Sequence, residues 1–406
     1  KIAAEHNIEI ATLSGTGVSG RVTKNDIMKV VDSAAQGLGF GFYYSHNQDW
    51  TFPGGNNGPQ LDKNGKKQSF DDYFKKKCLP QVEEITTKYG PIELIWFDTP
   101  GSMPRRYAKK LVDVVRKNQP KALVSGRVGH GLGDYRTMGD MEVPHHNEAG
   151  MWESVDTTND SWAYAHYDEN WKTPKSILKR LISCIGRGGT YMLNIGPRGD
   201  GSIPKRAVKS LEDSGKWIAR YPQVVYGTQA SPWQHALPWG DVTVKGKKLY
   251  LCVFDWPTSG KLYLPGLESK IKSARILKGK KSIKVSYKKS KGWTVFKVPT
   301  QAPEKLATII ELTLSEKPKV GFTWGLDPDA GVEILAEFSK VHKAKLSRKA
   351  WMEKFGEWKD VRHAHSWKKN GKATFEVNVL KAGDYQTHLT YAGQGRVVWG
   401  IAIRDG

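Results

Sequence analysis

Two acidic residues in this chain stand next to short apolar runs. Asp98 ends the run that begins at Leu94, and Glu153 follows Trp152, 55 residues further along the sequence. Two carboxylates on adjacent strand ends can cleave a glycosidic bond, because one attacks the anomeric carbon and the other protonates the leaving oxygen. The residues alone leave an alternative open for each of them: Asp98 also fits a helix cap, and Glu153 also fits an ion-paired surface position.

Chemistry of this kind needs elements that bring the two carboxylates together. Between residues 37 and 222 the sequence predicts strands that alternate with helices, and the strand candidates are 40–45, 93–98, 122–127, 151–155 and 190–195. Two helix starts are clear, because Ser69 precedes two aspartates and Thr173 precedes a proline. Such alternation is typical of parallel strands with crossover helices, which predicts an α/β region with Asp98 at a C-terminal strand end.

The pattern changes to a period of two near residue 225. Segments 248–254 and 261–264 alternate in this way between turns, which favours a β-sandwich over 225–315. A linker at 316–319 then leads to an accessory β-rich domain over 316–406, with strands expected at 373–379, 385–391 and 396–403. The fold class predicted from these patterns is multidomain α/β plus β.

The first 36 residues indicate two short helices joined by a glycine-rich loop. Residues 15–20 fit G-x-G-x-x-G, but the preceding strand and following acidic residue of a dinucleotide site are missing. The segment resembles the peripheral subunit-binding domain of 2-oxo acid dehydrogenase acyltransferases, from 1–6 onward. That resemblance implies a docking module for a protein partner, in which Arg21 and Lys24 match basic positions. A chimeric chain is the alternative, since no lipoyl or acyltransferase sequence follows.

Residues 37–315 resemble the α-L-fucosidases of glycoside hydrolase family 29. The resemblance rests on residues 40–46 (FGFYYSH), 94–98 (LIWFD), 152–154 (WES), 158–162 (TNDSW) and 188–197 (GGTYMLNIGP). It implies a retaining enzyme that removes terminal α-L-fucose from a fucosylated oligosaccharide or polysaccharide. In this match Asp98 is the nucleophile and Glu153 the acid/base residue.

Four further residues are expected to bind substrate by the same resemblance. Tyr44 matches a sugar-contacting tyrosine, with Tyr43 in its place if the strand register is shifted by one residue. His46 closes the same motif, and Arg127 matches a substrate-binding arginine, although an ion-paired strand-end arginine also fits. Trp96 either packs on the apolar face of fucose or lies in the core.

No cofactor or metal ion is expected. The pair His145-His146 lacks a third ligand at metal-binding spacing, and the three cysteines are too scattered for a metal site or a disulfide framework. The net charge is +22, and ten lysines and arginines lie between residues 270 and 291. This surplus fits solvated strand faces and also suits an acidic or sulfated glycan, whereas nucleic acid lacks a recognisable motif. No apolar run approaches the ~18 residues of a membrane helix.

An eight-stranded (β/α) barrel takes about 250 residues. With five strand candidates, the sequence predicts an incomplete barrel whose outer parallel strand is exposed. Activity is therefore one expectation, and the alternative is a non-catalytic binding or docking protein that fuses a subunit-binding module to a carbohydrate-binding fragment. Several aromatic residues in the last domain can stack on sugars or pack in its core: Trp324, Trp358, Trp367 and Trp399.

Overall fold

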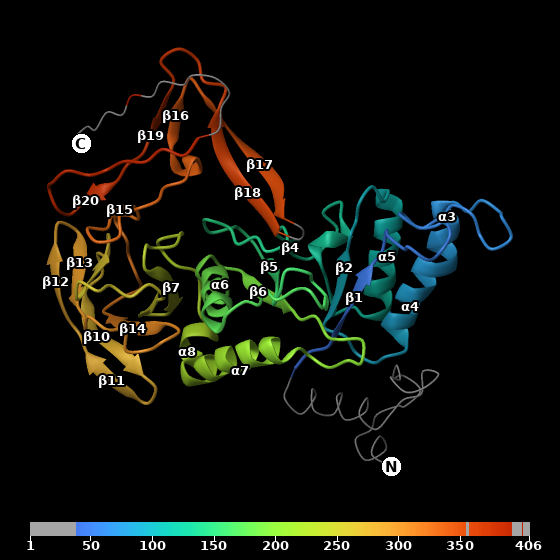
Figure 1. Cartoon of the computed structure of the whole chain (residues 1–406), viewed down its shortest axis with the longest axis horizontal. Coiled ribbons are helices and arrows are strands. Elements are labelled where there is room, and N and C mark those ends of the chain that lie inside the picture. Colours follow the sequence, from blue (N-terminus) through green and yellow to red (C-terminus); the bar gives the residue numbers. More distant parts are fainter. Residues whose placement is uncertain (1–37, 355–356, 392–399, 401–406) are drawn as a thin grey trace.

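The computed structural model describes residues 38–354, 357–391 and 400. The helical module predicted for 1–36 lies outside these residues, as does Trp399. The α/β part lies at one end of the molecule and the antiparallel sheets at the other, with the last strands reaching across between them (Figure 1).

Six strands of the α/β part form two parallel sheets. The first sheet has the order β1 (Gly41–Ser45), β2 (Leu94–Asp98), β3 (Leu123–Val124), and the second has the order β4 (Arg136–Thr137), β5 (Trp152–Thr157), β6 (Thr190–Asn194). Each strand is parallel to its neighbours, which confirms the predicted α/β alternation. The sequence pattern missed β4, because two residues are too few to show a period.

The helices of this part cover the first sheet and join the second sheet to the rest of the molecule. They are α3 (Phe70–Tyr73), the π-helical η3 (Phe74–Cys78), α4 (Leu79–Thr87), α5 (Arg105–Asn118), the 3-10 turn η4 (Gly126–Val128), α6 (Pro174–Gly186), α7 (Lys205–Arg220) and α8 (Pro222–Val225). Both predicted helix starts are confirmed: the Ser69 and Thr173 side chains each accept a hydrogen bond from a first-turn backbone N–H. None of the described helices is long and apolar enough to cross a membrane.

Eight antiparallel strands follow and form two sheets. The five-stranded sheet has the order β11 (Lys281–Lys284), β10 (Ile271–Lys278), β14 (Thr308–Leu314), β8 (Lys248–Val253), β7 (Gly240–Lys245), and the three-stranded sheet has the order β12 (Ser286–Ser290), β13 (Trp293–Lys297), β9 (Lys261–Leu264). One apolar core joins the two sheets, with Leu251, Leu262 and Phe296 among its members. A second core holds α6, α7 and α8 against the five-stranded sheet, and the buried ion pair Arg187–Asp241 reinforces this junction at 2.9 Å.

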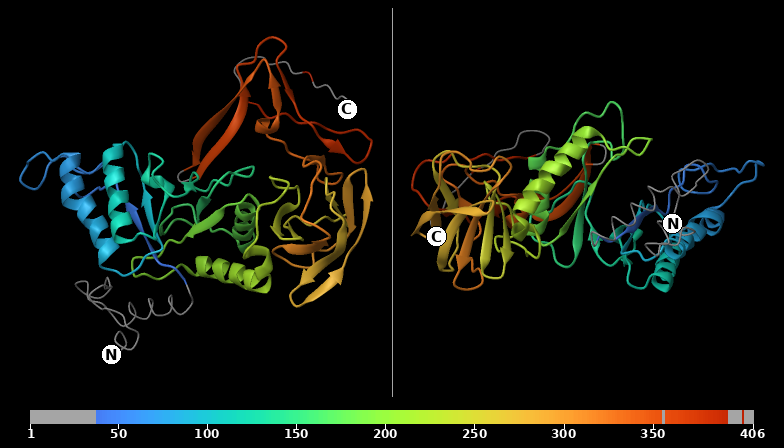
Figure 2. Two further views of the ribbon diagram at one scale, coloured as in Figure 1. Left: turned by 180° about the vertical axis from the view of Figure 1, so that it is seen from behind. Right: turned by 90° about the horizontal axis from the view of Figure 1, so that it is seen from below.

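The last described segment is β-rich but irregular. Its elements are β15 (Gly325–Leu326), η5 (Ala336–Phe338), β16 (Lys340–His342), β17 (Lys345–Lys354), β18 (Glu357–His365), β19 (Lys372–Thr374) and β20 (Asn378–Val379). The long hairpin of β17 and β18 extends back to the α/β part (Figures 1 and 2). The strand predicted at 385–391 is wrong, because these residues form no ladder with the described strands.

Candidate active site

Asp98 is the last residue of β2, and its carboxylate lies among polar and aromatic side chains. Its Oδ2 accepts a hydrogen bond from the Tyr43 hydroxyl at 2.8 Å, and its Oδ1 accepts one from Arg127 at 3.2 Å. Trp96, two residues earlier on the same face of the strand, stacks on Tyr43 with 5.6 Å between ring centroids. The Arg127 guanidinium lies 5.1 Å from the centre of the Trp96 ring. A carboxylate, a cation and two aromatic rings therefore converge at this strand end.

The pairing of β1 with β2 decides which tyrosine joins this group. Tyr43 is opposite Trp96 in the register, so alternation places Tyr43 on the carboxylate face and its neighbour Tyr44 on the other face. The Tyr44 hydroxyl donates to Gln81 on α4 at 2.8 Å, within the helix-covered core. His46 is fully buried on that side too, and burial lowers its pKa to about 4. The structure thus brings Tyr43 to the carboxylate face, whereas Tyr44 and the His46 ring, which packs on Phe97 behind the Asp98 backbone, lie on the other face.

The residue after Asp98 has an unusual backbone. Thr99 has φ +53, in the left-handed region that β-branched residues rarely occupy. Its hydroxyl lies 2.6 Å from that of Ser45, at the end of the neighbouring strand. Such a conformation costs about 1–3 kcal/mol and persists only where the surroundings hold it, as happens at many functional sites.

Glu153 contacts the Trp96 side chain of this group. It is the second residue of β5, is 6% exposed, and its Oε1 accepts hydrogen bonds from the Trp96 indole at 2.5 Å and from Thr137 at 2.8 Å. Burial raises the pKa of Glu153, and these two donors partly oppose that effect. The two carboxylates do not lie on adjacent strand ends, because β2 and β5 belong to different sheets and Glu153 stands at the beginning of β5.

A third carboxylate, which the sequence pattern missed, belongs to the group. Asp140 lies in the loop after β4, and its Oδ1 accepts a hydrogen bond from the Arg127 Nη2, while Nη1 of the same guanidinium contacts Asp98. Burial alone would lower the pKa of Arg127, but the carboxylates of Asp140 and Asp98 raise it above its ordinary value. Arg127 is therefore a cation that holds both carboxylates.

Three elements fix the backbone around Asp140. The carbonyl of Asp140 accepts a hydrogen bond from the Trp358 N–H of β18 at 2.9 Å, and the Met141 N–H donates to the Val155 carbonyl of β5 at 2.8 Å. Arg180 of α6 donates to the Met141 carbonyl. Met141 has φ +57, so this loop, like the one after Asp98, carries a left-handed residue directly after its carboxylate.

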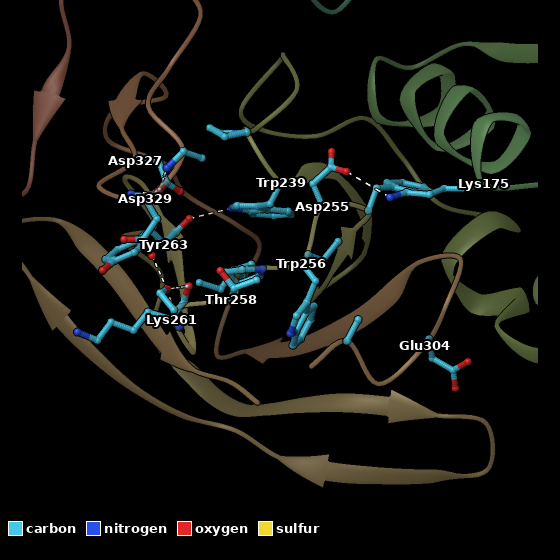
Figure 3. Close-up of a pocket in the computed structure, with 18 of the residues that line it drawn as sticks. Lys175, Trp239, Asp255, Trp256, Thr258, Lys261, Tyr263, Glu304, Asp327 and Asp329 are labelled. Atoms are coloured by element: carbon cyan, nitrogen blue, oxygen red, sulfur yellow. Dashed lines mark hydrogen bonds and ion pairs between the residues drawn. The ribbon is translucent and has the colours of Figure 1, made fainter. Parts of the chain in front are cut away.

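A cavity of about 580 Å³ lies elsewhere, beside the antiparallel sheets, and none of these residues lines it (Figure 3). Its wall includes Trp239, Trp256 and Asp255, and Asp255 is paired with Lys175 at 3.3 Å. Among the described residues β1 lies at the end of its sheet, and Tyr43 is 61% exposed, so solvent reaches the Asp98 group beside the Tyr43 ring.

Comparison with known proteins gives two family matches. The family profile described as Alpha-L-fucosidase matches residues 18–223, and that described as e3 binding domain matches residues 1–28. Plasma alpha-L-fucosidase of Rattus norvegicus is 30% identical over 262 residues, which are 59% of this chain and 55% of that protein. Alpha-L-fucosidase of Dictyostelium discoideum is 26% identical over 260 residues, 59% and 56% respectively. The chain thus spans about half the length of the curated relatives it matches.

Solved structures agree with these matches. Alpha-L-fucosidase isoenzyme 1 from Paenibacillus thiaminolyticus superimposes with a TM-score of 0.64 at 27% identity, over 78% of this chain and 85% of that one. The alpha-L-fucosidase from Vibrio sp. strain EJY3 shares the fold, with a TM-score of 0.67 at 23% identity, over 90% and 78%.

Proposed function

This chain belongs to the alpha-L-fucosidase family, and on that premise we propose that it removes terminal α-L-fucose from glycans with retention at the anomeric carbon. The carboxylate of Asp98 carries this proposal, because it ends a parallel strand and is held by Arg127 and Tyr43 beside the Trp96 ring. The two parallel sheets are, in this proposal, six strands of a (β/α)8-type barrel, in which active sites lie at C-terminal strand ends. Residues 37–224 then form the catalytic region, followed by the sandwich 225–315 and the accessory domain 316–406.

In the proposed reaction Asp98 attacks the anomeric carbon of fucose and forms a glycosyl ester while the protonated glycan departs. Water then attacks the same carbon, deprotonated by the residue that first acted as acid, and fucose leaves with its original configuration. Arg127 orients the Asp98 carboxylate through its hydrogen bond to Oδ1. Tyr43, which is 61% exposed, presents its ring to the apolar face of the sugar, and the buried Trp96 stacks behind it.

Two carboxylates compete for the role of proton donor. Glu153 matches the family pattern and has a raised pKa, but it is buried under Trp96 and bonded to it. Asp140 shares Arg127 with the nucleophile and is 25% exposed, so its carboxyl is the more accessible of the two. On position we assign the proton donor to Asp140, which in this role takes up a proton and leaves Arg127 to Asp98, with Glu153 as the residue that orients the Trp96 indole.

The test is hydrolysis of an aryl α-L-fucoside by the unaltered chain and by variants. Asp98→Ala is expected to fall to the background rate, because the nucleophile is lost. Asp140→Asn is expected to lose about 10²–10⁴-fold with a poor leaving group and less with an activated one. Azide should restore Asp140→Asn and give an α-fucosyl azide, since azide replaces the water that needs a general base and attacks the glycosyl ester from the same side. The same azide rescue of Glu153→Gln would move the role back to Glu153.

A second function is favoured by one observation, the exposed edge of β1 with its open ring of Tyr43. In that alternative the chain binds fucosylated glycans without cleaving them, or docks a protein through residues 1–36. No turnover by the folded, unaltered chain, together with saturable binding of a fucosylated oligosaccharide, would establish this alternative and reject hydrolysis.

A further inference from the structure

The hairpin of β17 and β18 touches the loop that carries Asp140. Besides the bond from the Trp358 N–H to the Asp140 carbonyl, the Arg348 guanidinium lies 3.7 Å from the Glu142 carboxylate. Arg348 is also paired with Asp360 across the hairpin at 2.5 Å. One face of this hairpin, far along the sequence, is therefore fixed against the candidate active site.

Two tryptophans of the hairpin lie on opposite faces. Trp358 is opposite Met352 in the register, and Trp351 is opposite Lys359, so alternation turns the two indoles to different sides. They are nearly equally exposed, at 38% for Trp358 and 39% for Trp351. Trp358 and Arg348 lie on the same face of the hairpin, and this face contacts the loop that carries Asp140.

Gly139 shows how closely Trp358 approaches this loop. A Cβ added to Gly139 would lie 2.9 Å from the Trp358 Cβ and 2.8 Å from a Glu142 carboxylate oxygen. Cβ atoms in proteins do not approach other heavy atoms this closely, so the loop can contact Trp358 only because Gly139 has no side chain. The chain of contacts runs from Trp358 to Asp140, then to Arg127 and to Asp98.

We propose that Trp358 forms the wall of a leaving-group subsite, on which the sugar ring next to the terminal fucose stacks. This inference rests on the proposed function. When a terminal fucose is bound at Asp98, the remainder of the glycan extends toward solvent past the proton donor. Trp358 is 38% exposed and lies against the loop that carries the proton donor, and partly exposed aromatic faces bind the C–H side of a pyranose. The preferred substrates are then oligosaccharides that carry a ring beyond fucose.

The test compares two leaving groups in matched variants. One substrate is an α-L-fucosyl-galactose disaccharide, and the other is α-L-fucosyl fluoride, which has no ring on the leaving side. Trp358→Ala is expected to lower the ratio of kcat/KM for the disaccharide to that for the fluoride about tenfold, which corresponds to the loss of one aromatic contact. Trp351→Ala, the equally exposed control, should leave the ratio within about twofold, and Trp358→Phe should restore most of it.

Saturation-transfer NMR with the disaccharide gives a result that is independent of turnover. The galactose protons should receive saturation from the unaltered chain and from Trp351→Ala, and lose it in Trp358→Ala. Equal ratios in the two alanine variants, or unchanged galactose saturation in Trp358→Ala, would overturn the subsite. Absence of fluoride hydrolysis by the unaltered chain would instead reject the proposed function, and the NMR result would still decide the role of Trp358. Circular dichroism and the Tm of each variant verify that the hairpin remains folded.

Discussion

Replacing Trp96 by phenylalanine is expected to destabilise the protein by an amount that depends on pH. The indole N–H donates to the Glu153 carboxyl at 2.5 Å, and Glu153 is 6% exposed. A hydrogen bond to an ionised group contributes about 1.5–3 kcal/mol, and one between neutral groups contributes about 0.5–1.5 kcal/mol. Phenylalanine keeps an aromatic ring beside Tyr43, so the lost donor is the part of the change that senses the charge on Glu153.

The sign of the pH dependence follows from the pKa of Glu153, which burial raises in the folded protein. The folded state therefore binds this proton more tightly than the unfolded state, whose glutamate has a pKa near ~4.3. The contribution of Glu153 protonation to the free energy of unfolding is complete at low pH and is lost as the pH rises from about 4.3 through the pKa of Glu153 in the folded protein. Without the Trp96 donor the pKa rises further, so the variant should lose about 1 kcal/mol at pH 4.5 and about 2 kcal/mol or more at pH 8.

Urea unfolding at these two pH values, followed by circular dichroism, measures both differences in the free energy of unfolding. The control is the same substitution in a Glu153→Gln background, where no carboxyl titrates and the cost of Trp96→Phe should be equal at the two pH values. A cost that does not change with pH in the parent background would refute the assignment of this hydrogen bond to a titrating carboxyl.

Two other expectations concern the core. Arg187→Met leaves the Asp241 carboxylate, which is 2% exposed, without its cationic partner, and should lower the free energy of unfolding in urea by about 3–5 kcal/mol. Adding Asp241→Leu should recover most of this loss. A loss below about 1 kcal/mol would contradict a buried ion pair. Burial raises the pKa of Cys78 and of Cys184 to about 12 and that of Cys252 well above its ordinary value. A thiol reagent at pH 8 should therefore find none of the three in the native protein and all three in urea, and rapid modification of the folded chain would disprove their burial.

The strand that carries Asp98 could be predicted from the sequence, because a short apolar run that ends in one charged residue is typical of a buried strand. The position of the preceding strand, β1, could also be predicted, but which of its side chains face Asp98 could not. Tyr43 and Tyr44 are the same residue type, and only the pairing with β2 shows that Tyr43 faces the carboxylate. Alternation fixes which residues share a face, and a partner strand is needed to say which face is which.

Asp140 and the hairpin escaped prediction for a different reason. Asp140 lies in a loop without any periodic pattern, and its contacts are with Arg127, 13 residues earlier, and with Trp358, 218 residues later. The β17–β18 hairpin carries charged residues along most of its length and packs against that loop, so it shows no apolar face of its own.

The left-handed residues Thr99 and Met141 have a consequence for the engineering of this protein. Each directly follows a carboxylate of the candidate site, so the backbone is strained next to both acidic side chains. A selection for heat resistance alone should favour Thr99→Gly and Met141→Gly, because glycine adopts a left-handed conformation without a steric penalty. The same replacements would free the loops that aim Asp98 and Asp140, so resistance to heat would be obtained at the expense of turnover.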